Sequence, residues 1–224
     1  MNLKAESIKR VIVYGMGLMI LAFGIAFSIN SNLGVSPVSS LPYVVSLILG
    51  TNLSRGIFLV YCISVVIQII ILRKDFKIRN LMQLVVTFFF GYFTDFANYV
   101  LGDFCFPTYF GQLLMLGISI VLMAIGLCTY INVQLQSMPI ESLIQAFALK
   151  ITKKPFHETK IYIDSSLVII AVVLSFLFLG NIQGVREGTL LAAVLVGRTM
   201  KEVRKVILPL LDKYVFDSKE SEKA

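Results

Sequence analysis

The sequence predicts an all-α integral membrane protein, with six transmembrane helices arranged as two inverted three-span repeats. Three observations lead to this fold class. Hydrophobic residues make up 57% of the 224 residues, charged residues only 15%, and the mean hydropathy is +0.85. The apolar residues occur in long blocks, which is the pattern of membrane-spanning helices. Two short polar segments interrupt these apolar regions and predict that each repeat contains a short re-entrant or broken helix.

The predicted spans are apolar blocks that approach the roughly 20 residues needed to cross the hydrocarbon core. They cover 11–29, 57–72 and 81–101 in the first repeat, and 112–131, 161–179 and 189–208 in the second. We assign 1–101 to the first repeat, 112–208 to the second and 209–224 to a cytoplasmic tail. The first apolar run is too long for a signal peptide, and no A-x-A cleavage site follows it. We therefore expect it to be retained as a span.

Each polar interruption is followed by an apolar segment that is too short to cross the bilayer. The first break (30–37) precedes a short helix over 38–50, and the second break (132–139) precedes one over 140–150. Thirteen helical residues rise only about 20 Å, less than the roughly 30 Å of the hydrocarbon core. Pro37 and Pro139 suit the first turn of these helices, where a missing N–H costs nothing. Both segments are therefore predicted to be re-entrant or broken helices; whether they enter the membrane or lie at its interface stays open.

The two breaks are copies of one another. Asn30, Leu33 and Pro37 align without gaps on Asn132, Leu135 and Pro139, with an offset of 102 residues. The shared order of span, break, proline, short helix and two further spans supports an internal repeat. Because each half contributes an odd number of spans, the second half would enter the membrane from the opposite side.

The basic residues predict the orientation. With the N-terminus in the cytoplasm, both termini and the loops 73–80 and 150–160 face the cytoplasm. Only Arg55 and Arg186 of the 20 Lys and Arg then lie outside, as the positive-inside rule requires. Topology thus explains the net charge of +7, and we expect no nucleic-acid partner. The predicted location is the cell membrane, with several passes and both termini cytoplasmic.

Polar residues of the two breaks and the short helix after the second break form the candidate site. A broken helix can present its positive N-terminal end to an anion, and a carboxylate near the bilayer centre is costly enough to suggest a function. The candidate substrate-binding residues are Asn30, Asn32, Gly34, Ser36, Asn132, Gln136, Glu141 and Gln145; Asp95 and Asn98 of the third span are candidates for coupling or for a vestibule. In the alternative interpretation the polar side chains only satisfy their own broken backbone, and Glu141 only complements a helix dipole.

These features predict a small-solute secondary transporter or permease with its site where the broken helices meet. The alternative is a non-transporting scaffold or accessory protein of an export or biosynthetic system. The sequence has no phosphate-binding loop, nucleophile–base pair or metal-ligand cluster, so we expect neither an enzyme nor a cofactor or metal. The expected partners are the lipid bilayer and an unidentified small solute or membrane protein; the solute and the oligomeric state stay open.

Two short motifs resemble those of the YczE/YitT-like family of bacterial integral membrane proteins, especially its YczE branch. One is the turn Asn32-Leu33-Gly34-Val35-Ser36-Pro37, and the other is Gly188-Thr189-Leu190 with Val196-Gly197 near the last span. The resemblance extends to about residue 200 and implies a multi-span membrane protein. The chain departs from the family pattern at Val38, where the branch has an aromatic residue, and at Gln136, opposite Gly34, where a glycine is expected.

Overall fold

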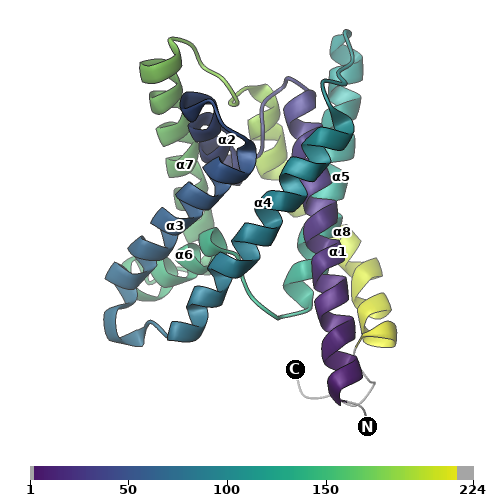
Figure 1. Cartoon of the computed structure of the whole chain (residues 1–224), viewed down its shortest axis with the longest axis vertical. Helices are drawn as coiled ribbons and strands as arrows, with labels where there is room; N and C mark the ends of the chain where they lie inside the picture. Colours follow the sequence, from purple (N-terminus) through teal and green to yellow (C-terminus); the bar gives the residue numbers. More distant parts are fainter. Residues whose placement is uncertain (1–2, 216–224) are drawn as a thin grey trace.

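The structure, a computed structural model, describes residues 3–215 and consists of α-helices joined by short connections (Figure 1). The helices are α1 (Leu3–Asn30), α2 (Pro37–Leu49), α3 (Leu53–Leu72), α4 (Met82–Leu101), α5 (Tyr109–Asn132), α6 (Pro139–Phe147), α7 (Phe156–Leu179) and α8 (Glu187–Tyr214). Two short 3₁₀ turns, η1 (Arg73–Asp75) and η2 (Ile78–Leu81), connect α3 to α4, and a π-helical turn, η3 (Ala148–Thr152), extends α6. Residues 3–215 contain no β-strand, which confirms the all-α prediction.

Five helices of the described chain are long and apolar enough to cross a membrane: α1, α3, α4, α5 and α7. They match the first five predicted spans. The sixth predicted span, 189–208, lies within α8, whose 28 residues are interrupted by charges from Arg198 onward. The crossing of the membrane by α8 therefore stays a prediction. This helix continues through 209–214, where a tail was predicted, and residues 216–224 of that tail lie outside the described residues.

The two short helices begin as predicted. Pro37 is the first residue of α2 and Pro139 is the first residue of α6. Before each helix the chain turns through a non-glycine residue with positive φ, Asn32 with φ 56° and Gln134 with φ 55°; the first turn also contains Gly34 with φ 99°. The helix α2 packs against α7, and α6 packs against α3, so each short helix contacts a long helix from the other half of the chain. Figure 1 shows α2 above α6 in the view.

The most extensive helix contact joins α1 to α5, and glycines allow it. A Cβ on Gly126 of α5 would lie 2.6 Å from the backbone N of Leu21, and one on Gly24 of α1 would lie 2.8 Å from that of Met123. Both distances are too short for any side chain, as in small-residue contacts between membrane helices. The Ser119 hydroxyl also donates to the Gly24 carbonyl at 2.8 Å. The most apolar stretch of α5 is 56% buried, compared with 17% for α7, which places α5 centrally and α7 at the periphery.

We expect Gly126→Val to destabilise the protein, because the added side chain would push α5 away from α1. Overpacking of this kind costs about 1–3 kcal/mol of unfolding free energy. Gly117→Val is the matched control, because Gly117 lies on the same helix and a Cβ added there would meet no atom within 4 Å. Thermal unfolding of both variants in mild detergent checks this; equal melting temperatures would contradict the assigned α1–α5 contact.

Candidate functional site

The first break is closed by the segment that enters α8. The backbone N–H of Val35 donates to the Gly184 carbonyl at 2.9 Å, and that of Gly188 donates to the Leu33 carbonyl at 2.8 Å. The Arg186 side chain adds a hydrogen bond to the Asn32 carbonyl at 2.8 Å. These bonds supply partners for backbone groups that the turn between α1 and α2 leaves without helical partners.

Gly34 makes this closure possible. Its φ of 99° lies in a region that L side chains rarely adopt, and a Cβ there would lie 2.6 Å from both the Arg186 backbone N and the Thr189 hydroxyl oxygen. Local serines complete the break: Ser31 donates to the Ser28 carbonyl at 2.6 Å and accepts from the Leu33 N–H at 3.3 Å. Leu33 and Val35 are buried, so the first break is packed against neighbouring residues.

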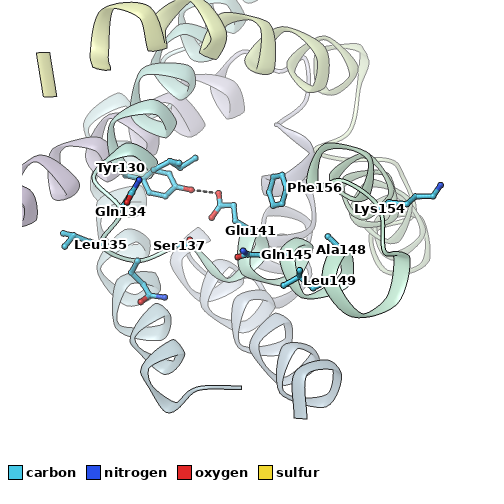
Figure 2. Close-up of a pocket in the computed structure, with 12 residues that line it drawn as sticks. Tyr130, Gln134, Leu135, Ser137, Glu141, Gln145, Ala148, Leu149, Lys154 and Phe156 are labelled. Carbon is cyan, nitrogen blue, oxygen red and sulfur yellow. Dashed lines mark hydrogen bonds between the residues drawn. The ribbon is translucent and has the colours of Figure 1, made fainter. Parts of the chain in front are cut away.

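The second break instead borders a cavity of about 740 Å³, which we call the α6 cavity (Figure 2). It extends from the end of α5 across the second break and α6 to the start of α7. Its walls are formed by Tyr130, Ile131, Gln134, Leu135, Gln136, Ser137, Glu141, Gln145, Ala148, Leu149, Lys154 and Phe156. The gapless sequence alignment of the two breaks pairs Gly34 with Gln136, which lines this cavity.

Glu141 is the acidic side chain of the α6 cavity, and it is tied to both ends of the second break. One carboxylate oxygen accepts a hydrogen bond from the Tyr130 hydroxyl at the end of α5 (Figure 2). The other accepts from the Met138 backbone N–H at 2.9 Å. Glu141 lies in the first turn of α6, where its charge complements the helix dipole. The carboxylate therefore caps α6 and faces the cavity as well.

Two further tyrosines surround this acid. The Tyr14 hydroxyl donates to the Gln136 carbonyl at 2.8 Å, and the Tyr14 ring meets the Tyr130 ring edge-on, with centroids 5.9 Å apart. Tyr61 of α3 is buried and near enough to interact electrostatically with Glu141. Helices α1, α3 and α5 thus each place one tyrosine around the Glu141 carboxylate.

A buried glutamine pair holds α6 against α3 and α4. The Gln68 side-chain amide donates to the Pro139 carbonyl at 2.9 Å, and its oxygen accepts from the Gln83 amide at 3.2 Å. Both side chains are fully buried. An amide inside an apolar helix is costly unless it is hydrogen-bonded, so this pair fixes the position of the first residue of α6.

Charged side chains near the mouth of the α6 cavity are largely paired. Lys160 bonds Asp164 at 2.8 Å on the first turns of α7, as expected from their spacing. Lys154 donates to the Tyr162 hydroxyl at 3.2 Å and lies 3.8 Å from the Glu158 carboxylate. The hydrogen bond to Tyr162 raises the pKa of the Lys154 ammonium above its ordinary value, which keeps the group charged.

The structure brings only part of the predicted site together. Gln136, Glu141 and Gln145 line the α6 cavity. Asn32, Gly34 and Ser36 lie in the sealed first break. The side-chain amide of Asn30 donates to the Gly102 carbonyl at 2.8 Å, and that of Asn132 donates to the Cys128 carbonyl at 2.6 Å. The Ser36 hydroxyl bonds Ser39 at 3.1 Å instead of capping α2. The breaks therefore do not line one shared cavity.

Asp95, a candidate for coupling or for a vestibule, caps a neighbouring helix. Its carboxylate accepts the Ser54 backbone N–H at 3.0 Å and also the Ser54 hydroxyl, and Ser54 lies in the first turn of α3. The carboxylate thereby complements the positive end of the α3 dipole. Asn98 lies one turn further along α4 and is partly buried.

Sequence reasoning missed Tyr130, Phe156 and the Gln68–Gln83 pair. The glutamines left a usable signal, because each interrupts an otherwise apolar helix surface. Tyr130 and Phe156 left none, because aromatic residues are common in membrane helices and their role depends on the position of Glu141.

We predict that Gln68→Leu destabilises the protein, because the buried Pro139 carbonyl would lose its partner. The expected cost is about 1–3 kcal/mol of unfolding free energy. Gln112→Leu is the control, because Gln112 is only partly buried near the start of α5. Thermal unfolding in detergent measures both, and an unchanged melting temperature for Gln68→Leu would show that the bond does not hold α6.

Comparison with known proteins gives a family but no activity. The chain is 28% identical to the uncharacterized membrane protein YczE of Bacillus subtilis (strain 168) over 149 residues, which are 66% of this chain and 67% of the relative. It is 27% identical to the uncharacterized protein YyaS of the same organism over 202 residues, 90% of this chain and 93% of the relative. No solved structure matches it significantly. Residues 8–205 match one family model. With five apolar helices of spanning length, this is a membrane protein of the YczE-like kind, and it belongs to the family of unknown function DUF6198.

Proposed function

We propose that this protein is a small-solute permease or secondary transporter whose solute site is the α6 cavity. One observation carries the proposal: an interrupted helix in an apolar bundle borders a cavity of about 740 Å³ that reaches the acidic side chain Glu141. Small-molecule sites in proteins have volumes of about 300–1,000 Å³ and few polar groups on apolar walls. Ionisable residues at membrane depth commonly mark solute or ion pathways.

The architecture proposed with this function is two inverted repeats, with α8 as the sixth span. Two features support it. The left-handed residues Asn32 and Gln134 and the helix-starting residues Pro37 and Pro139 occupy equivalent positions in the two halves. The contact of α2 with α7 has its counterpart in the contact of α6 with α3.

The proposed orientation places both termini in the cytoplasm. In Figure 1 the start of α1, the connection between α3 and α4, and the end of α8 all lie toward the lower end. The basic residues of the 73–80 loop thus lie at the same end as those at the start of α1, as the positive-inside rule favours. The α6 cavity borders the connection before α7 through Lys154 and Phe156, so it would open to the cytoplasm.

The orientation predicts opposite labelling of two loops. In a background with Cys62, Cys105 and Cys128 replaced by serine, Asp103→Cys should react with a membrane-impermeant maleimide in intact cells. Lys153→Cys should react only after the cells are permeabilised, because the loop before α7 faces the cytoplasm. Gel shifts with a maleimide of high mass report both variants, and the reverse pattern would overturn the orientation.

The different states of the two breaks also favour transport. The first break is sealed by residues 184–188, whereas the second borders an open cavity. A transporter built from inverted repeats is expected to hold its halves in different conformations, because access alternates between the two sides.

We also propose that the role is not enzymatic. The residues that line the α6 cavity include neither His nor Cys to pair with Ser137 or Glu141 as nucleophile or base.

One observation favours the alternative role, a non-transporting scaffold or accessory protein. Only 17% of the most apolar stretch of α7 is buried, so a broad apolar surface faces outward. The helix exposes Ile161, Ile169, Ile170, Val173, Phe176, Leu177 and Phe178. This surface could contact a membrane protein partner as well as lipid.

Reconstituted vesicles separate the two functions. We expect vesicles with the protein to accumulate at least one solute from a screen of amino acids, vitamins, amines and inorganic anions. Glu141→Gln should lower that uptake by about tenfold or more, a loss of roughly 1.4 kcal/mol, because the cavity loses its acidic side chain. Glu202→Gln is the matched control, since Glu202 is exposed and pairs with Lys205 at 2.7 Å. Vesicles indistinguishable from empty ones for every solute would end the transport proposal and leave the scaffold.

A further inference from the structure

The walls of the α6 cavity combine one acid with aromatic and aliphatic side chains. Figure 2 shows Tyr130 and Phe156 on opposite sides of Glu141. Leu135 and Leu149 add aliphatic surface. Glu141 is the acidic residue among the lining residues, and the other polar ones are mainly neutral amides. An acid between aromatic rings is suited to organic cations, which gain both from the opposite charge and from the negative faces of the rings.

The surrounding charges leave the acid without a dedicated cation. Lys160 and Asp164 both interact electrostatically with Glu141, but they pair with each other at 2.8 Å, so their charges largely cancel. Lys154 also lines the cavity, yet Figure 2 shows its side chain directed away from Glu141, and it bonds Tyr162. The hydrogen bonds to Glu141 come from Tyr130 and Met138, two neutral donors.

The start of α6 is already occupied by an anionic group of the protein itself. The sequence indicates that the free N-terminus of a broken helix could hold an anionic solute. In the structure, the Glu141 carboxylate accepts the Met138 N–H at 2.9 Å and takes that position. A second anion there would meet like-charge repulsion. The α6 cavity is therefore a poor anion site.

A divalent metal ion fits no better. Calcium takes about six to eight oxygen ligands, several of them carboxylates. Residues 8–213 contain no group of three His, Cys, Asp or Glu side chains placed to hold a metal ion. The amides and apolar walls suit a solute that carries one positive charge on an organic body.

We propose that the α6 cavity binds organic cations, meaning solutes with an alkylammonium or guanidinium group, and that Glu141 is the counter-charge. The cationic group lies beside Glu141 with Phe156 and Tyr130 as aromatic neighbours, and the apolar body lies against Leu135 and Leu149. This inference rests on the α6 cavity being the solute site of the proposed function. It adds the charge and chemical class of the solute.

Matched pairs of compounds test the charge requirement by direct binding to the purified protein in detergent. The cations are choline, butylammonium and butylguanidinium, and their neutral counterparts of similar shape are 3,3-dimethylbutan-1-ol, butan-1-ol and butylurea. We expect at least one cation to bind about tenfold or more tightly than its counterpart, because an ion pair and a cation–π contact together contribute that much. Isothermal titration calorimetry measures each affinity.

Two variants assign the preference to the named residues. Glu141→Gln keeps the size and the acceptor for Met138, and it should reduce the preference for the cation to the roughly two- to fivefold that a cation–π contact alone supplies. Phe156→Leu should weaken cation binding about two- to fivefold, the range of an exposed cation–π contact, whereas Phe156→Tyr should preserve it. Phe156 is 46% exposed, so its substitution leaves the packed core intact.

The outcomes separate this inference from the proposed function. Cation-selective binding that depends on Glu141 supports the ligand class, even if vesicles show no uptake and the transport proposal falls. Equal affinity within every pair, or cation binding that survives Glu141→Gln unchanged, overturns the ligand class. Uptake restricted to neutral or anionic solutes overturns it as well, while leaving the transport proposal in place.

Discussion

The close approach of α1 and α5 is the contact on which the other features depend. Backbone atoms of the two helices meet across Gly24 and Gly126, where no side chain fits. The first break follows the last residue of α1, Asn30, and the second break follows the last residue of α5, Asn132. It also brings Tyr14 of α1 beside Tyr130 of α5. A shift between the two helices would therefore move the walls of the α6 cavity and the donors to Glu141 together.

The two breaks differ in the groups that pack against them. Gly34 lets the backbone of residues 184–188 bond directly to the first break. Gln136 occupies the equivalent position in the second break, and its side chain lines the α6 cavity. The open break keeps its geometry through longer side chains instead: Gln68 bonds the Pro139 carbonyl, and Glu141 bonds the Met138 N–H.

Much of the fold could be predicted from the sequence because it depends on local patterns. Apolar blocks located five long helices, and Pro37 and Pro139 located the starts of the short ones. The candidate site was predicted less well. The two breaks were expected to meet at one cavity, but sequence alone does not show that residues 184–188 cover the first. Contacts between segments about 150 residues apart leave no periodic pattern, and the polar interruptions at Gln68 and Gln83 do not show that the two side chains pair.

The seal over the first break has a consequence for assembly of the chain during synthesis. The partners of Leu33 and Val35 are Gly188 and Gly184, which are synthesised about 150 residues later. These contacts of the first break can therefore form only after the segment that enters α8 has been synthesised. The Pro139 carbonyl, in contrast, finds Gln68 already made, so its contact is available as soon as α6 follows.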